Sequence, residues 1–275
     1  MRIAVIGHVE HVILGRVPAV PPRGGIAHLE HPRTFPGGGG GIAFFQLTRP
    51  SAEILFYTAV GNDEAARQVR KRIERTGARL LAAERAEPQT RDLVMITPDD
   101  ERTIVVVGEP LHPEKSDPLP WDALATCDAA YFTAQDPLAL QAARTARLLV
   151  VTARRRPALL RSGVRADVVV GSALDPREVC RLQDFPPAQR PAALVMTEGP
   201  AGGAVETDEG KHRFPAPPSP PRGGGSYGAG DSFAGALTFF VATGLPVLEA
   251  CTRAGFYGAA VLGALEPLEA QLPLA

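Results

Sequence analysis

A glycine-rich stretch in the last fifth of the chain contains the residues whose types and spacing could do chemistry. The stretch reads Gly223-Gly224-Gly225-Ser226-Tyr227-Gly228-Ala229-Gly230-Asp231, and Phe233, Leu237, Phe240 and Val241 then recur at helical spacing. The sequence therefore predicts a glycine-rich turn that leads directly into a buried helix, which begins near Gly228. The first amides of such a helix have no partner within it, and glycines let a phosphate approach them closely.

Asp231 falls in the first turn of this predicted helix. The helix dipole stabilises a carboxylate there, so we expect Asp231 to be ionised at neutral pH. It could accept the proton of a hydroxyl that attacks a phosphorus atom, while the preceding amides stabilise the charge that develops. The simpler interpretation is a helix start at which Asp231 is only a cap.

A second glycine run, Gly37 to Gly41, precedes the apolar stretch Ile42 to Leu47, for which we expect a buried helix. One interpretation is a flexible turn, and another is a turn that faces a ligand. Residues 38–43 also satisfy the dinucleotide pattern G-x-G-x-x-A of an NAD-dependent enzyme. However, the run lies far from the first predicted strand, and five successive glycines satisfy many patterns by chance. A G-x-x-x-x-G-K-[ST] segment is missing, which excludes P-loop chemistry.

The elements that must position these residues follow from an alternation of apolar and amphipathic stretches. We expect strands at 2–7, 54–60, 129–133, 148–152, 167–171 and 192–197, and a polar hairpin at 203–214. We expect helices from Asp63 to about Thr76, after Asp136, from Arg156 to Ser162, after Asp175, and from Pro246 to about Gly263. This alternation predicts one α/β domain over residues 1–275, with a parallel sheet covered by helices on both faces.

A small second sheet is predicted from the amino-terminal half of the chain. The segments 91–97 and 103–107 flank the polar turn Pro98 to Glu101 and predict a hairpin. A further short strand is expected at 26–31. These segments, within about 8–35 and 88–108, could form a sheet that projects from the main domain as a lid.

Composition excludes several classes of protein. The chain has 275 residues, 45% of them apolar and 21% charged, which is typical of a globular domain. A formal net charge of -1 creates no overall field that favours nucleic acid. We expect no membrane span and no signal peptide, because the apolar runs are too short. Cys127, Cys180 and Cys251 are widely separated, which is typical of reduced thiols in a cytoplasmic protein.

The segment Gly228-Ala229-Gly230-Asp231-Ser232-Phe233 resembles G-A-G-D-x-F, the second signature of the ribokinase-like (PfkB) carbohydrate kinases. That signature usually begins with Asp-Thr, where this chain has Gly225 and Ser226. The resemblance implies that Asp231 is the base that activates a sugar hydroxyl. It implies that Gly228, Ala229 and Gly230 supply the amides that hold the phosphate, and that Ser226 lies beside the nucleotide.

The amino-terminal half resembles the same family at the expected substrate site. The run Gly37 to Gly41 is similar to the first family signature, which implies that Gly38, Gly39 and Gly40 contact the substrate. The family often has Asn in this turn, where Gly41 stands here. Glu10, alone or with His11, takes the place of the family's Asp after the first strand. Arg91 of the predicted lid hairpin is a further substrate-binding candidate.

The nucleotide and metal positions are implied by three weaker similarities. Ser172-Ala173-Leu174-Asp175 stands where the family has Asn-x-x-Glu, which implies that Ser172 binds nucleotide and that Asp175 binds Mg²⁺; a helix cap before Pro176 is the alternative. Thr197, Gly199 and Gly202 resemble T-x-G-x-x-G, for which a hairpin turn is the alternative. Gly258 lies on a helix that borders the adenine in the family, and close helix packing is the alternative.

The resemblance extends from Arg2 to about Gly263 and implies a ribokinase-like α/β/α fold with a small β lid. It also implies transfer of a phosphoryl group from ATP, with Mg²⁺, to a hydroxyl of a sugar, a nucleoside or a sugar acid. Many relatives dimerise through the lid, so a homodimer is expected. Because the departures from the family pattern cluster at substrate and metal positions, a non-catalytic sugar-binding or nucleotide-binding protein of the same fold is the alternative.

Overall fold

The computed structural model describes residues 1–49, 52–218, 220, 223 and 225–275. Within these residues the main sheet has nine strands in the order β13-β12-β11-β10-β9-β8-β1-β4-β5. In this spatial order, the seven strands β11, β10, β9, β8, β1, β4 and β5 are parallel to one another. The strands β12 and β13 add an antiparallel edge. Their bounds are Arg2–Ile6 (β1), Glu53–Val60 (β4), Arg79–Glu84 (β5), Ala129–Phe132 (β8), Leu149–Thr152 (β9), Val168–Ser172 (β10), Ala193–Thr197 (β11), Gly203–Thr207 (β12) and Gly210–Phe214 (β13).

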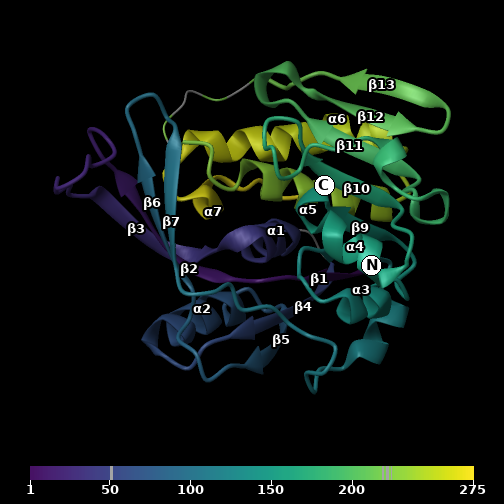
Figure 1. Cartoon of the computed structure of the whole chain (residues 1–275), viewed down its shortest axis with the longest axis horizontal. Helices are drawn as coiled ribbons and strands as arrows, with labels where there is room; N and C mark the ends of the chain where they lie inside the picture. The colour runs from purple at the N-terminus through teal and green to yellow at the C-terminus, as the bar shows by residue number, and fades with distance from the viewer. Residues whose placement is uncertain (50–51, 219, 221–222, 224) are drawn as a thin grey trace.

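Helices cover both faces of this sheet (Figure 1). Alternate residues of β1 show the two sides: Ile3 and Val5 join a core with one group of helices, whereas Ala4 and Ile6 join a second core with another group. The first group is α1 (Gly38–Leu47), α2 (Glu64–Glu74), α5 (Ala229–Ala242), α6 (Val247–Ala260) and α7 (Pro267–Ala270). The second group is α3 (Pro137–Ala143) and α4 (Arg156–Ser162), with the 3-10 segment Trp121–Thr126. The prediction of a three-layer α/β fold is confirmed.

A separate four-stranded sheet, hereafter the lid, lies at one side of the main sheet (Figure 1). Its strands are β2 (Glu10–Arg16), β3 (Glu30–Gly37), β6 (Arg91–Ile96) and β7 (Arg102–Val107), in the order β3-β2-β6-β7. The expected strand at 26–31 is wrong over most of its length, since Ile26 is 88% exposed and β3 starts at Glu30. Prolines at 32 and 36 are tolerated in β3 because it is an edge strand.

Two local predictions are corrected by the structure. The glycine run is neither a flexible turn nor only a lead-in, because α1 already begins at Gly38. Turns replace the helix expected after Asp175. One hydrogen bond there has helical spacing, from Val179 N–H to Asp175 O (3.0 Å). The carboxylates of this segment bind groups outside it, which holds the chain in turns. Gly224 of the predicted loop lies outside the described residues. Within those residues, every helix is too short or too polar to cross a bilayer.

Candidate active site

The candidate site lies where the order of the parallel strands reverses. β1 pairs with β4 on one side and with β8 on the other, and the chain reaches β8 only after it has completed β4, β5 and the lid. In open α/β sheets, ligands bind at such a switch point, beyond the carboxyl ends of the strands. Here Gly7 and His8 follow β1, and Thr133 follows β8. A β-carbon on Gly7 would lie 2.4 Å from Thr133 Cγ2, so only glycine fits at this junction.

The first turn of α1 brings backbone directly against two acidic side chains. A β-carbon on Gly38 (φ +76°) would lie 3.0 Å from Glu10 Oε2, and one on Gly39 would lie 3.2 Å from Asp231 Oδ1. Gly38 N–H donates to Tyr227 Oη (3.1 Å) and Gly39 N–H to His8 Nε2 (3.3 Å). Gly38 and Gly39 therefore lie beside Glu10 and Asp231, and their contact with substrate stays a prediction.

Gly40 has a packing role at the end of β1. A β-carbon there would lie 2.5 Å from His8 O and 2.8 Å from Gly7 C. Both atoms belong to backbone that follows β1 and cannot move aside. Gly40 thus allows α1 to pack on the end of β1, and its contact with substrate stays a prediction.

Asp231 lies in the first turn of α5, as predicted. The amino-terminal cap of α5 is Gly228, in the left-handed region at φ +80°, and Ser232 N–H donates to Gly228 O (2.9 Å). Asp231 is three residues beyond this cap, so the cap interpretation does not hold. Gly230 is exposed, and a β-carbon built on it meets nothing within 4 Å. Gly230, next to Asp231 in the sequence, therefore borders open space, whereas Gly228 packs against Ile42 and Pro267.

The charge state of Asp231 reflects its surroundings more than the helix dipole. Burial, followed by the negative charge of Glu178, raises the pKa of Asp231 to about 6, although Arg154 and Arg102 act in the opposite direction. Asp231 is therefore mostly ionised at neutral pH, as expected, although its pKa lies only about one unit below that pH. A carboxylate with a pKa close to the working pH is suited to accepting and releasing a proton.

The lid contributes a buried pair of carboxyl groups to the site. Glu10 and Asp92 are 6% and 4% exposed. Burial, then the hydrogen bond with Asp92, raises the pKa of Glu10 to about 9, and burial raises the pKa of Asp92 as well. Burial therefore favours the protonated forms of this pair. Glu10 was predicted, whereas Asp92 was missed.

Strand geometry directs Arg91, the predicted substrate-binding residue of the lid, away from Glu10 and directs Asp92 toward it. Successive residues of a strand point to opposite faces. Arg91 Nη2 donates to Asp63 Oδ2 (2.5 Å) at the start of α2, whereas Asp92 faces Glu10. Glu10 lies on one face of β2, and the parallel pairing of β2 with β6 extends that face to Asp92.

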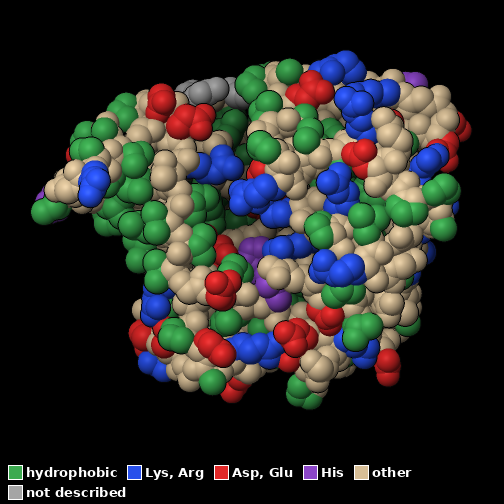
Figure 2. Space-filling model, in the orientation of Figure 1, with side chains coloured by type: hydrophobic (Ala, Val, Ile, Leu, Met, Phe, Trp, Pro, Cys, Tyr) green, Lys and Arg blue, Asp and Glu red, His purple; other side chains and the backbone are tan. Residues whose placement is uncertain are grey.

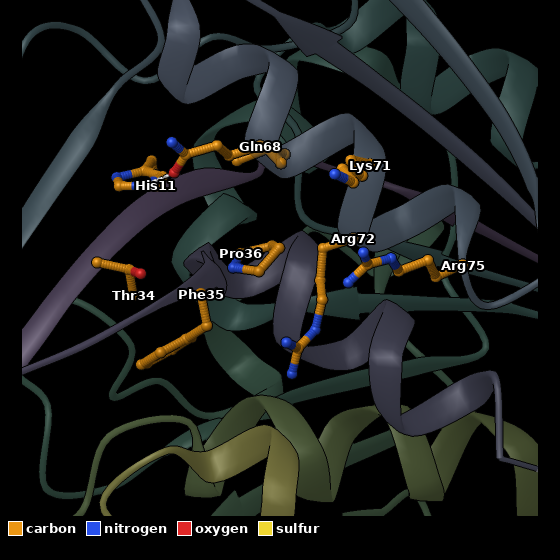
Figure 3. A pocket seen from close by; sticks show the side chains of 9 residues that line it. His11, Thr34, Phe35, Pro36, Gln68, Lys71, Arg72 and Arg75 are labelled. Atoms are coloured by element: carbon orange, nitrogen blue, oxygen red, sulfur yellow. Dashed lines mark hydrogen bonds between the residues drawn. The ribbon is translucent and has the colours of Figure 1, made fainter.

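His11 also points away from Glu10, by the same alternation. Its Nε2 lies 3.0 Å from Gln68 Oε1 of α2. Figure 3 shows the space that it borders, a pocket of about 200 Å³ between α2 and β3 that is also lined by Lys71, Arg72 and Arg75. Arg72 in turn contacts Glu266 (2.8 Å). His11 is thus separate from the residues around Asp231.

The predicted nucleotide positions meet at the carboxyl ends of β10 and β11. Ser172 and Thr197 are register partners, and Ala173 N–H donates to Thr197 O (2.8 Å). Gly199 and Gly202 have φ of +57° and +82°, which favours glycine at both positions. This edge of the sheet is the one at which Asp231 lies. Gly258 is buried on α6, and a β-carbon there would lie 3.0 Å from Ala229 O, so it allows close helix packing, and its place beside the nucleotide stays a prediction.

Ser226 connects the glycine loop to the lid. Its Oγ accepts a hydrogen bond from Arg102 at the start of β7. Nearby, Arg16 of β2 donates through Nη2 to Gly223 O (2.6 Å) and lies 3.3 Å from Asp100 Oδ1. Two lid arginines therefore hold the loop that leads into α5.

The predicted metal ligand Asp175 is occupied by cationic side chains. Arg154 Nη2 lies 2.5 Å from Asp175 Oδ2 and 2.8 Å from Glu178 Oε1, and Arg177 also contacts Asp175. Glu178, whose Oε2 accepts from Ser172 N–H (2.9 Å), is the carboxylate that acts on the pKa of Asp231. In the described part of the chain, no three His, Cys, Asp or Glu side chains gather as a metal site.

Further polar residues of the site were not predicted from the sequence. The space-filling view shows a hollow between the lid and the main domain, in which histidine, cationic and acidic side chains gather (Figure 2). His8, Thr133 and Arg155 all follow carboxyl ends of parallel strands. A systematic reading of those ends would have found them. His112 comes from the loop after β7, and its sequence context carried no signal.

Comparisons with known proteins agree with this geometry. No family model matches the chain, and a search of curated protein sequences finds no match. Among solved structures, ribokinase from Thermotoga maritima matches with a TM-score of 0.80 at 17% identity, over 99% of this chain and 96% of that one. The nucleoside kinase of Methanocaldococcus jannaschii, an archaeal member of the ribokinase family, matches with a TM-score of 0.75 at 14% identity (98% and 94%).

Phosphofructokinase-2 from Escherichia coli, solved in complex with substrates and products, matches with a TM-score of 0.74 at 15% identity, over 97% of this chain and 96% of that one. The chain therefore has the ribokinase-like fold over almost its whole length. The dinucleotide interpretation of the glycine run loses support, because the strand before that run is β3 of the lid and not β1.

Proposed function

We propose that this protein is an ATP-dependent kinase of the ribokinase-like family that phosphorylates a hydroxyl of a small sugar-like molecule or nucleoside. The observation that carries the proposal is the position of Asp231. Its carboxylate lies in the first turn of α5, three residues beyond the cap Gly228 and opposite Gly39. A base and the amino-terminal amides of a helix thus lie in the same turn, an arrangement suited to phosphoryl transfer.

The acceptor would lie between the lid and the first turn of α1. Its hydroxyls would contact the Glu10–Asp92 pair, whose oxygens can accept hydrogen bonds and whose protonated carboxyl can donate one. Asp231 would take the proton of the reacting hydroxyl while its oxygen attacks the terminal phosphorus of ATP. The bond to the bridging oxygen breaks, ADP leaves, and the amides of Gly228 to Gly230 stabilise the transferring group.

ATP would lie along the ends of β10 and β11, beside Ser172, Thr197, Gly199, Gly202 and Ser226. Mg²⁺ on its phosphates would reduce their negative charge. This ion usually keeps several waters and needs only one or two carboxylates, so it does not require a cage of protein ligands. We propose Glu178 beside Asp175 for this role, because its negative charge acts on Asp231. Arg154 contacts both carboxylates, and Arg177 contacts Asp175 as well.

The remaining proposals concern assembly and location. A homodimer stays a prediction, and β7 is the strand that could support it, since Ile104, Val105, Val106 and Val107 are 39–52% exposed. A cytoplasmic location is also proposed. It fits the three cysteines, which are free and buried.

The experiment that tests the function is an acceptor screen with the purified chain, ATP and Mg²⁺. ADP formation is followed with neutral sugars, sugar acids and nucleosides, and products are identified by phosphorus NMR. We expect at least one acceptor to increase ADP formation well above the rate without acceptor and to yield a phosphate ester. ATP hydrolysis that no acceptor stimulates, together with no ester, would contradict the proposal and favour a binding protein.

A further inference from the structure

Arg155 is a cation in the candidate site that lacks an anionic partner. It ends the 3-10 turn that follows β9, and it is half-buried. Its Nε donates to Thr133 O (2.9 Å) and its Nη2 lies 3.4 Å from His112 Nε2. Among the described residues no carboxylate lies within 4 Å of it, whereas the adjacent Arg154 has both Asp175 and Glu178. A partly desolvated, unpaired guanidinium is unfavourable unless a ligand supplies the anion.

Two histidines beside Arg155 are neutral, so they add no positive charge to that of Arg155. The rings of His8 and His112 pack edge to face with centroids 4.9 Å apart. Burial first, then the charge of Arg155, lowers the pKa of His8 to about 3, and burial lowers that of His112 to about 2. The unprotonated Nε2 of His112 can accept from Arg155 and thereby orients the guanidinium. The pKa of Arg155 is lowered to about 10 by burial and by Arg154, so it stays a cation at neutral pH.

Arg155 shares one space with the reacting groups. The carbonyl oxygen of Thr133 accepts a hydrogen bond from Arg155. Thr133 Oγ1 and Asp231 Oδ1 each lie 3.2 Å from the position that a β-carbon on Gly39 would occupy. On the lid side, Arg155 and Glu10 each affect the ionisation of the other. The space between α1 and the lid is thus bordered by the cation of Arg155 and by the proton-sharing acid pair Glu10 and Asp92.

We propose that the phosphate acceptor is a polyhydroxylated carboxylic acid of monosaccharide size, whose carboxylate binds Arg155 and whose hydroxyls contact Glu10, Asp92 and Asp231. This inference rests on the proposed kinase function. One guanidinium matches the single charge and planar shape of a carboxylate. A phosphate monoester has almost two charges and would leave one of them unpaired. The carboxylate is unchanged in the reaction, since the hydroxyl proton goes to Asp231 and ADP is the leaving group.

Calorimetric binding to the full chain without ATP tests the proposal independently of turnover. The probes are pairs that differ in the carboxylate, gluconate against glucitol and xylonate against xylitol, with glucose 6-phosphate as the phosphate probe. We expect the acids to bind at least about tenfold more tightly than the polyols. Arg155→Gln should reduce this preference to less than about threefold, and Arg155→Lys should keep part of it. Arg156→Gln, which removes the next arginine and its contact with Asp184 (3.5 Å), should keep all of it.

Equal binding of acids and polyols by the unaltered chain would overturn the proposal, whatever the variants do. Tighter binding of glucose 6-phosphate than of the acids would overturn the choice of a carboxylate. Turnover assays separate this inference from the function on which it rests. If ATP phosphorylates polyols and acids equally well, the kinase stands and the acid preference is wrong. If acids bind through Arg155 but no probe is ever phosphorylated, the anion site stands and the kinase is wrong.

Discussion

The carboxylate of Asp231 lies against the backbone of Gly39, since a β-carbon built on Gly39 would be 3.2 Å from Asp231 Oδ1. A side chain at position 39 would therefore project between the base and the acceptor. We expect Gly39→Ala to lower kcat/KM for the acceptor by roughly tenfold or more, because small displacements at a reacting centre are costly. Its melting temperature should change little, since the nearest atoms are side-chain oxygens at an open edge.

Two neighbours in the same helix provide matched controls for Gly39→Ala. A β-carbon on Gly41 would meet Val9 Cγ2 at 3.1 Å, so Gly41→Ala should keep near-normal activity. A β-carbon on Gly40 would meet backbone at 2.5 Å, so Gly40→Ala should lose about 1–3 kcal/mol of stability. Near-normal turnover by Gly39→Ala, or the same loss of activity in Gly41→Ala, would contradict this view of the site.

The contacts of Arg16 and Arg102 with the glycine loop predict that the lid and the nucleotide loop act together. Arg16 binds Gly223 O (2.6 Å), and Arg102 binds Ser226 Oγ. Replacing both arginines by Ala should loosen the loop, raise the KM for ATP by roughly three- to tenfold and increase ATP hydrolysis without acceptor. Steady-state kinetics would show this, with the exposed Arg33→Ala on β3 as the control. If the double variant and Arg33→Ala have the same KM for ATP and the same rate of ATP hydrolysis, the two contacts have no functional role.

The buried Glu10–Asp92 pair predicts a pH-dependent stability. The pKa of Glu10 is raised from 4.5 to about 9, so the folded state loses stability as pH rises from about 4.5 through 9. Glu10→Gln cannot ionise, so its stability relative to the parent should increase with pH, by the order of a few kcal/mol at pH 9. Melting temperatures from pH 5 to 9 would measure this. The exposed Glu74→Gln should show no such trend, and a pH-independent difference for Glu10→Gln would exclude a shared proton.

Glu178 raises the pKa of Asp231 through its negative charge. Glu178→Gln should therefore move the acidic limb of the pH–rate profile to lower pH. If Glu178 also helps to hold Mg²⁺, the variant should need more Mg²⁺ for half-maximal activity. Asp175→Asn is the matched control, because the carboxylate of Asp175 is held by Arg154 and Arg177. An unchanged acidic limb in Glu178→Gln would show that its charge does not reach the base.

The fold was predictable because its signals are local. The predicted alternation of apolar strands and helices is confirmed, including the helices that begin after Asp63 and Asp136. Both carboxylates accept hydrogen bonds from the first turns of these helices. Asp231 was found through its glycine-rich setting, because few other features need so many glycines before a buried helix. Glu10 was found only through the family resemblance.

The parts that were missed depend on tertiary pairing. Arg91 and Asp92 are adjacent in sequence, and only the pairing of β6 with β2 determines which of them faces Glu10. Asp175 was the predicted metal ligand and Glu178 was not considered, and Arg154, from a different strand end, contacts both carboxylates. His112 reaches Arg155 from a loop 43 residues away in sequence. Such long-range contacts leave no periodic pattern in the residues that make them.

The most direct test of the central claim is the pH dependence of phosphoryl transfer by the parent chain and by Asp231→Asn. With an acceptor identified in the screen, single-turnover rates are measured from pH 4.5 to 8.5. The parent rate should rise with pH up to about 6 and then level off, because Asp231 must be ionised to act as the base. Asp231→Asn should be slower by roughly 10²- to 10⁴-fold and should lack this limb. A variant that is folded, as fast as the parent and dependent on pH in the same way would contradict the assignment of Asp231 as the base.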